Sequence, residues 1–157
     1  MTNVIISGSS GKMGRVLTDM IAQQPDIQIV AGFDPSPAPG SSFPVFQSPA
    51  DCSVSADCII DFSHPSALTG LLDFCKKTGC GIILATTGYS PEQLEEIEAA
   101  SKSLRIFRSA NMSLGINVLM ALVRQTAKIL GDSWDIEIVE KHHNRKLDAP
   151  SGTALML

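Results

Sequence analysis

The sequence predicts an α/β fold in which helices cover both faces of a doubly wound parallel sheet. Short apolar runs, such as residues 4–6 and 58–60, alternate with segments of helical periodicity along the first two thirds of the chain. These runs are continuously apolar, which is typical of parallel strands that are buried on both faces. Strands that alternate with helices form βαβ units, and such units build a parallel sheet.

Capping residues place the individual elements. The predicted strands cover residues 4–6, 27–33, 58–62, 81–85 and 105–108. The predicted helices cover residues 12–24, 64–79, 90–102 and 115–130. Ser90 precedes Pro91 and Gln93, which is the pattern of a capping box with proline at the first helical position. Ser63 is the expected cap of the second helix, and Gly131 is expected to end the last one.

Two stretches depart from this alternation. Residues 34–49 contain five prolines, which disfavour regular structure and indicate a surface excursion. Residues 134–141 alternate apolar and polar side chains, as a half-exposed strand does, and predict that a second sheet begins there. We therefore expect a first domain over residues 1–112 and the beginning of an α+β domain over residues 113–157.

The composition is that of an ordinary folded domain. The 157 residues are 44% hydrophobic and 18% charged, which excludes a disordered chain. A net charge of -4 gives no reason to expect nucleic acid as a partner. No apolar run approaches the length of a membrane span, and the N-terminus lacks the pattern of a signal peptide. We therefore expect a cytoplasmic protein without membrane contact.

The four cysteines, Cys52, Cys58, Cys75 and Cys80, lack the paired spacing of a metal site. We interpret them as buried or half-buried thiols rather than as metal ligands or disulfides, which is what a reducing compartment favours. The sequence therefore predicts no metal.

A glycine-rich turn follows the first strand and opens the first helix. Gly8, Gly11 and Gly14 have the spacing G-x-x-G-x-x-G, whose middle glycine lies one residue later than in the commonest dinucleotide fingerprint. Backbone N–H groups at a helix N-terminus attract phosphate, and glycine lets a diphosphate approach without a Cβ in the way. The turn therefore predicts a dinucleotide site in a Rossmann-type sheet, although glycines needed only for tight packing would give the same pattern.

Asp34 strengthens the dinucleotide interpretation. It lies 20 residues beyond Gly14 and directly after the second strand, where an acidic side chain accepts hydrogen bonds from the adenosine ribose hydroxyls. The alternative is an ordinary turn residue. Because a 2′-phosphate would meet this carboxylate and no arginine follows Pro35, we expect NADH as the preferred cofactor, with NADPH possible through Lys12.

The densest group of chemically active side chains lies near the end of the chain. Two imidazoles and three cations fall within six residues: His142, His143, Lys141, Arg145 and Lys146. This combination suits an acidic small molecule that must also receive a proton. Ser151, Gly152 and Thr153 follow Pro150 in the pattern of a helix N-terminus whose N–H groups could hold a carboxylate. From the residues alone, a solvated basic loop is the alternative.

Four segments of the chain resemble the dihydrodipicolinate reductase family. Residues 142–154, HHNRKLDAPSGTA, match its H-H-x-x-K-x-D-A-P-S-G-T-A signature. The other three, in family order, resemble its glycine turn, its G-T-T-G loop and its S-x-N-[FM]-S loop, here residues 8–15, 85–88 and 109–113. The chain departs from the pattern at Ala85, where Gly is usual, and at Met112, where Phe is commoner. Both departures could shift cofactor affinity, and neither removes a reacting group.

The resemblance implies a role for each matching residue. His142 would be the proton donor and Lys146 a second donor. The substrate carboxylates would be contacted by His143, Ser151, Gly152 and Thr153. The cofactor would be held by Gly8, Ser9, Ser10, Gly11, Lys12, Met13 and Asp34 at its diphosphate and adenosine end, and by Ala85, Thr86, Thr87, Ser109, Ala110, Asn111 and Met112 at its nicotinamide half.

The reaction implied by the resemblance is NAD(P)H-dependent reduction of 4-hydroxy-tetrahydrodipicolinate, a cyclic unsaturated dicarboxylate of diaminopimelate and lysine synthesis. A non-catalytic NAD(H)-binding sensor and another imine or aldehyde reductase are the alternatives, and residues 142–153 favour the reductase. The family continues beyond Leu157 through the rest of a substrate and tetramerisation domain. We therefore expect a homotetramer at full length, and we expect this chain by itself to bind NADH but to turn over poorly.

Overall fold

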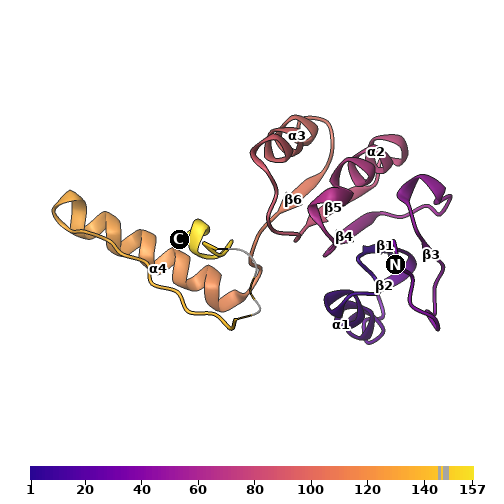
Figure 1. Ribbon diagram of the computed structural model, residues 1–157, viewed down its shortest axis with the longest axis horizontal. Helices are drawn as coiled ribbons and strands as arrows, with labels where there is room; N and C mark the ends of the chain where they lie inside the picture. The colour runs from indigo at the N-terminus through magenta and orange to yellow at the C-terminus, as the bar shows by residue number, and fades with distance from the viewer. Residues whose placement is uncertain (145, 147–148) are drawn as a thin grey trace. The chain divides into compact units, whose positions relative to one another are not determined.

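The computed structural model describes residues 1–144, 146 and 149–157. The chain forms two compact units, residues 1–108 and residues 109–157, which we call unit 1 and unit 2. Unit 1 contains a parallel sheet with its helices, and unit 2 contains one long helix followed by extended chain (Figure 1).

Unit 1 is built on a six-stranded sheet in which every pair of neighbouring strands is parallel. The strands are β1 (Thr2–Ser7), β2 (Ile27–Phe33), β3 (Val45–Phe46), β4 (Cys58–Asp61), β5 (Gly81–Leu84) and β6 (Ile106–Arg108). Their order, β3-β2-β1-β4-β5-β6, is that of a doubly wound Rossmann sheet. The predicted fold class is thus confirmed, and the winding reverses between β1 and β4, where ligands of such sheets bind.

Helices cover both faces of this sheet (Figure 1). They are α1 (Lys12–Ile21), α2 (Leu68–Thr78) and α3 (Pro91–Ser101). Successive residues of a strand point to opposite faces, so β1 contributes Val4 and Ile6 to the cluster that contains Ile21 of α1. Ile5 joins the larger cluster on the other face, which contains residues of α2 and α3. Both faces of β1 are buried, which is why residues 4–6 are continuously apolar.

The capping box predicted at the start of α3 is confirmed. The Ser90 hydroxyl accepts a hydrogen bond from the Gln93 amide at 3.3 Å, and the Gln93 side chain accepts one from the Ser90 amide at 3.1 Å. The predicted cap of α2 is wrong. Ser63 donates its hydroxyl hydrogen to the carboxylate of Asp61, and His64 caps the short 3₁₀ turn η2 (Pro65–Ala67) that precedes α2. The Asp61 carboxylate accepts hydrogen bonds from both the hydroxyl and the amide of Ser63, and so it holds Ser63 in a turn ahead of the helix rather than at its N-cap.

The proline-rich excursion contains more regular structure than expected. The two residues of β3 pair with Gly32 and Phe33 at the edge of the sheet, and a 3₁₀ turn, η1 (Pro49–Asp51), follows. Proline cannot donate to a strand ladder, so a strand between Pro44 and Pro49 is short and lies at an edge.

Unit 2 begins with the helix α4 (Leu114–Leu130), which Gly131 ends with a φ of +71°. Short 3₁₀ turns follow as η3 (Gly131–Ser133) and η4 (Ala154–Met156). The strand predicted over residues 134–141 is wrong, since these residues form no strand pairing. An extended segment becomes a strand only beside a hydrogen-bonded neighbour, and none of the described residues from 109 onward forms one. Within the described parts of the chain, no helix could span a membrane.

Candidate functional site

The glycine-rich turn lies between the carboxyl end of β1 and the start of α1, as the sequence predicted. Gly8 has a φ of +78°, and a Cβ added there would lie 2.6 Å from the carbonyl oxygen of Phe62. A Cβ at Gly14 would lie 2.6 Å from the carbonyl oxygen of Ser9. Real side chains do not tolerate these distances, so glycine is required at both positions. The turn therefore brings bare backbone to the N-terminus of α1.

Asp34 holds this turn to the segment that follows β2. Its carboxylate is buried and accepts hydrogen bonds from the amides of Ser10 and Ser36, both at 2.9 Å. The Ser10 hydroxyl in turn accepts a hydrogen bond from the amide of Ala38 at 2.9 Å. The two features that the sequence paired by spacing, the glycine turn and the acid after the second strand, are in direct contact.

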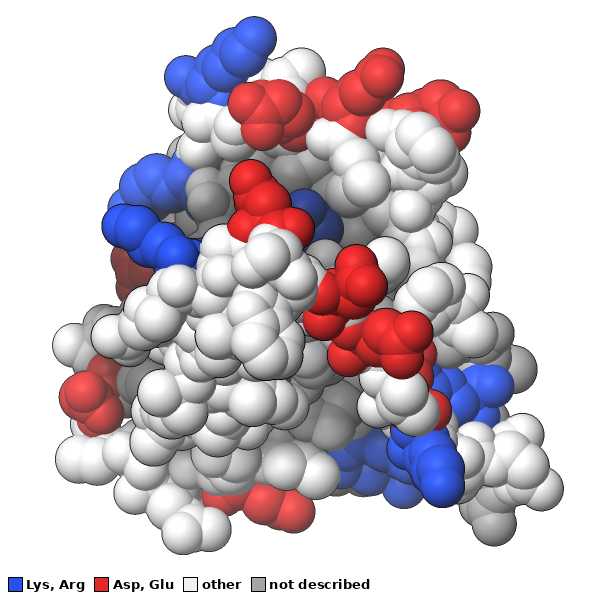
Figure 2. All heavy atoms as spheres, turned by 90° about the vertical axis from the view of Figure 1, so that its left-hand side faces the viewer, with Lys and Arg blue, Asp and Glu red and all other residues white. Residues whose placement is uncertain are grey.

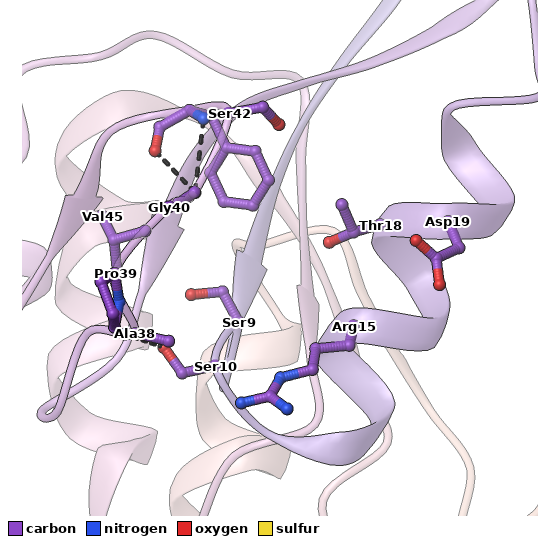
Figure 3. A pocket seen from close by; sticks show the side chains of 12 residues that line it. Ser9, Ser10, Arg15, Thr18, Asp19, Ala38, Pro39, Gly40, Ser42 and Val45 are labelled. Atoms are coloured by element: carbon purple, nitrogen blue, oxygen red, sulfur yellow. Dashed lines mark hydrogen bonds between the residues drawn. The ribbon is translucent and has the colours of Figure 1, made fainter.

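A cavity of about 350 Å³ opens beside the turn, between α1 and residues 38–45. Figure 3 shows the Ser9 hydroxyl and the Arg15 guanidinium pointing toward this space from the turn and from α1. Ser9 is 7% exposed, and its hydroxyl is a buried polar group without a hydrogen-bond partner among the described residues. Buried hydroxyls are rarely left unpaired, which makes the Ser9 hydroxyl a candidate contact for a polar group of a ligand.

A second polar cluster lies at the carboxyl ends of β4 and β5. Asp61, which is 1% exposed, accepts hydrogen bonds from the hydroxyls of Thr86 at 2.7 Å, Tyr89 at 3.3 Å and Ser63 at 2.5 Å. Burial, together with the neighbouring Asp61 carboxylate, raises the pKa of Tyr89 well above its ordinary value of 10.0. Tyr89 therefore remains a neutral donor. The sequence motifs indicated Thr86 as a site residue, whereas Ser63 was expected only as a helix cap and no motif indicated Asp61 or Tyr89.

Together these features fit a dinucleotide. The N–H groups at the N-terminus of α1 can bind a diphosphate, and the carboxylate oxygens of Asp34 can accept hydrogen bonds from ribose hydroxyls. The Ser9 hydroxyl has no hydrogen-bond partner among the described residues and is a third candidate contact. Lys12 and Met13 are exposed at the first turn of α1, where side chains can reach a ligand on the helix N-terminus. Figure 2, which faces the left-hand side of Figure 1, shows acidic and basic side chains interspersed on that face.

The loop at residues 109–113 of unit 2 is organised by its own side chains. The Ser109 hydroxyl donates to the carbonyl of Asn111 at 2.9 Å, and the Asn111 side chain accepts from the amide of Ser113 at 2.9 Å. The Asn111 side-chain amide also donates to the hydroxyl of Thr153 at 2.8 Å. The structure thus joins a residue of the predicted nicotinamide loop to a residue of the predicted carboxylate-binding turn.

Glu140 links that turn to the first histidine of the pair. Its carboxylate accepts a hydrogen bond from the Ser151 amide at 2.8 Å and lies 3.5 Å from Nδ1 of His142. Hydrogen bonds from the Ser151 hydroxyl and amide lower the pKa of Glu140 below its ordinary value of 4.5. Ser151 is 3% exposed, and its hydroxyl accepts a hydrogen bond from the amide of Ala154 at 3.0 Å.

For the other predicted residues of this segment, the structure gives mainly backbone contacts. Lys146 donates its backbone N–H to the carbonyl oxygen of His143 at 3.2 Å, which makes a turn between the two. Arg145, one of the three predicted cations, lies outside the described residues. The predicted helix after Pro150 is the 3₁₀ turn η4, so Gly152 and Thr153 stand in a turn rather than at the start of an α-helix.

The structure gathers the predicted site residues into two groups. Gly8 to Met13, Asp34 and the loop of residues 85–87 belong to the carboxyl edge of the sheet in unit 1. Residues 109–112, the two histidines, Lys146 and residues 151–153 belong to unit 2. Among the described residues, no cluster of histidine, cysteine or acidic side chains could hold a metal ion.

Family models and curated relatives all indicate the same protein family. The model of the dihydrodipicolinate reductase N-terminus matches residues 2–112, and the model of the C-terminus matches residues 115–157. The 4-hydroxy-tetrahydrodipicolinate reductase of Clostridium perfringens (strain SM101 / Type A) is 49% identical over 158 residues, and that of Caldanaerobacter subterraneus is 49% identical over 157. Each alignment covers 100% of this chain and 62% of the relative, so the chain spans less than two thirds of their length.

Solved structures give the same fold. Dipicolinate-bound dihydrodipicolinate reductase from Paenisporosarcina sp. TG-14 superposes with a TM-score of 0.75 at 26% identity, over 99% of this chain and 63% of that one. Scyllo-inositol dehydrogenase from Lactobacillus casei, solved with bound NAD(H) and scyllo-inositol, superposes with a TM-score of 0.61 at 17% identity, over 82% of this chain and 42% of that one. The second likeness concerns the fold alone.

Proposed function

Because the chain belongs to the dihydrodipicolinate reductase family, we propose that the full-length protein reduces 4-hydroxy-tetrahydrodipicolinate to tetrahydrodipicolinate, with loss of water, using a nicotinamide cofactor. The observation that carries this proposal is that both family models match, in order, along nearly the whole chain. The contact between the glycine turn and Asp34 at the switch point of the sheet supports it.

We assign cofactor binding to residues 1–112 and substrate binding to residues 113–157 together with the rest of the protein. The amides around Gly8 and Gly11 would hold the diphosphate, and Asp34 the adenosine ribose. The loops that contain Thr86 and Asn111 would hold the nicotinamide half. When bound, NADH would supply the hydride, and the chain's part is to orient the reactants and to hold charge and protons.

Proton donation is assigned to His142, with Lys146 as a second cation. The electron-poor carbon that receives a hydride needs a proton or cation close to the developing negative charge, and these two side chains supply one each. Glu140 lies 3.5 Å from the His142 ring and steadies it on one side. His143 and the turn of residues 151–153 would hold the substrate carboxylates, which need cationic or N–H partners.

The preference for NADH follows from Asp34. Its buried carboxylate accepts two amide hydrogen bonds and would repel a 2′-phosphate. A ribose 2′-hydroxyl would instead donate a hydrogen bond to it. NADPH remains usable if Lys12 offsets this repulsion. The homotetramer of the full-length protein stays a prediction that rests on the family resemblance, and the cytoplasmic location stays a prediction that rests on the sequence pattern.

The test is an absorbance assay on the full-length protein. NADH is mixed with the freshly formed product of dihydrodipicolinate synthase, and the loss of absorbance at the reduced nicotinamide band is followed. We expect loss that depends on both the protein and the dicarboxylate. Binding of NADH without any turnover would instead indicate a nucleotide sensor, and turnover of other imines or aldehydes alone would indicate a different reductase.

A further inference from the structure

We propose that Asp61 is a positioning residue that fixes the loop of residues 85–89 for the nicotinamide half of the cofactor. The inference rests on the proposed function, because it assumes that the protein binds a nicotinamide dinucleotide. It deepens that function by assigning a task to a buried acid that does not belong to the glycine turn, to the ribose-binding position or to the basic segment.

The loop is attached to Asp61 at three points. The Asp61 carbonyl accepts a hydrogen bond from the Ala85 amide at 3.0 Å. Its carboxylate oxygen Oδ2 accepts from the Thr86 hydroxyl at 2.7 Å and from the Tyr89 hydroxyl at 3.3 Å. These contacts hold both ends of the loop, which carries Gly88 with a φ of +82° and no regular structure of its own.

The same short segment contacts the diphosphate turn. Phe62 follows Asp61, donates its amide to the Ser7 carbonyl at 3.0 Å, and leaves no room for a Cβ at Gly8. The other carboxylate oxygen of Asp61, Oδ1, accepts from the hydroxyl and the amide of Ser63. Residues 61–63 thus lie between the two loops that hold opposite halves of a dinucleotide, and they fix the spacing between them.

Stability alone does not account for a carboxylate at this position. Asp61 is 1% exposed, and the donors described for its carboxylate are neutral, namely the hydroxyls of Thr86, Tyr89 and Ser63 and the Ser63 amide. A buried charge without a counterion is costly, and a neutral side chain of the same shape would avoid that cost. The carboxylate instead fixes the orientation of its partners. The hydroxyls of Thr86 and Tyr89 both donate to Oδ2, so each of these side chains is held in one orientation.

The experiment compares two nucleotides on the full-length protein. NADH contains both halves, whereas ADP contains the adenosine half and the diphosphate but lacks the nicotinamide riboside. Dissociation constants are measured by calorimetry for the unmodified protein, for Asp61→Asn, and for Asp73→Asn. Asp73 is a matched control because it is an exposed acid on α2, with 64% of its side chain accessible.

We expect Asp61→Asn to weaken NADH binding by about tenfold or more, the worth of a hydrogen bond to a charged group, while ADP binding changes less than about twofold. Asp73→Asn should leave both constants unchanged. Equal weakening of NADH and ADP would show a general loss of structure, and an unchanged NADH constant would show that the loop needs no such anchor. Either result overturns the proposal.

A second variant covers the case in which Asp61→Asn does not fold. Tyr89→Phe removes one donor and keeps the ring, so it should weaken NADH binding in the same selective way by a smaller factor. An unmodified protein that binds neither nucleotide would contradict the proposed function itself. That outcome is distinct from one in which the unmodified protein binds NADH and both variants bind it equally well.

Discussion

Glu140 holds two groups of unit 2 at once, the amide of Ser151 and the imidazole of His142. Its carboxylate already occupies the Ser151 amide, which belongs to the turn that we assign to substrate binding. A second anion therefore needs the neighbouring groups, which are the amides of residues 152 and 153, the hydroxyl of Thr153 and the side chain of His143. Glu140 would thus shape the site without touching the reacting atoms.

The pH dependence of this contact follows from the lowered pKa of Glu140. A carboxyl group whose pKa is lower in the folded protein stabilises the fold above its unfolded value, near 4.5, and loses that contribution as the pH falls through the lowered value. We therefore expect the difference in free energy of unfolding between the unmodified protein and Glu140→Gln to be largest near neutral pH. It should shrink below pH 4.5. Urea unfolding at several pH values measures it, and Glu137→Gln, an exposed acid on the same segment, is the control. A difference independent of pH would contradict the assignment.

His142 carries the main chemical prediction. A positioned acid is worth roughly 10²- to 10⁴-fold in rate, so His142→Gln in the full-length protein should lower kcat by that factor with little change in the KM for NADH. Steady-state kinetics measure both constants. His64→Gln, which alters an exposed histidine of unit 1, should leave kcat within about threefold. A similarly small effect at His142 would remove it from the role of proton donor.

At the scale of elements, the chain's own patterns predicted most of unit 1. Strand β2 has the predicted bounds, and α3 begins at the predicted capping box, because periodicity and caps are local signals. Asp34 could be assigned because a known spacing links it to Gly14. Asp61 could not be assigned in this way, because no known spacing links an acid after this strand to a function. Its partners Thr86 and Tyr89 also lie 25 and 28 residues away in the sequence. The prediction of a strand over residues 134–141 was wrong because the pairing of strands depends on residues far away in the sequence.

The glycine turn gives a prediction at this scale, with a control from the same chain. Gly8 and Gly40 both have positive φ, but only at Gly8 would a Cβ collide with backbone. Gly40→Ala should cost about 1–2 kcal/mol of stability, the penalty of a left-handed conformation. Gly8→Ala should cost more and should also weaken NADH binding, because the turn must move away from Phe62. Urea unfolding and NADH titration measure the two effects, and equal costs at both positions would contradict the steric argument.

The cysteines give a further prediction for the packing of unit 1. Cys75 and Cys80 are fully buried between α2 and β5, whereas Cys52 and Cys58 are partly exposed. A hydrogen bond with Cys80, together with burial, raises the pKa of Cys75, and burial raises that of Cys58. Because Cys75 and Cys80 are buried away from a reagent in solution and burial raises the pKa of Cys58, Cys52 should be alkylated first in the native protein. Mass spectrometry after brief treatment with iodoacetamide tests this, and early labelling of Cys75 would contradict the packing.

For the molecule as a whole, the account assigns the cofactor to the sheet of unit 1 and the proton donors to unit 2. Sequence patterns predicted both groups of residues, the first from a turn and an acid of known spacing, the second from a thirteen-residue signature. No local sequence pattern encodes how the two groups combine in one reaction, and experiments on the full-length protein address this question.

Cofactor choice is a property of the whole cofactor site. If Asp34 keeps its buried position when the site is filled, kcat/KM for NADH should exceed that for NADPH, because a 2′-phosphate would approach a carboxylate. Steady-state kinetics with both cofactors decide this. A clear preference for NADPH would show that Lys12, Arg15 or both neutralise that repulsion, and it would contradict the role given to Asp34.

The most direct test of the central claim follows the hydride itself. NADH deuterated at C4, in each of its two stereoisomeric forms, is incubated with the full-length protein and the cyclic dicarboxylate, and the reduced product is analysed by mass spectrometry. The account predicts one deuterium in the product from one of the two forms and none from the other. Product without deuterium from either form, or NADH bound but never oxidised, would contradict it.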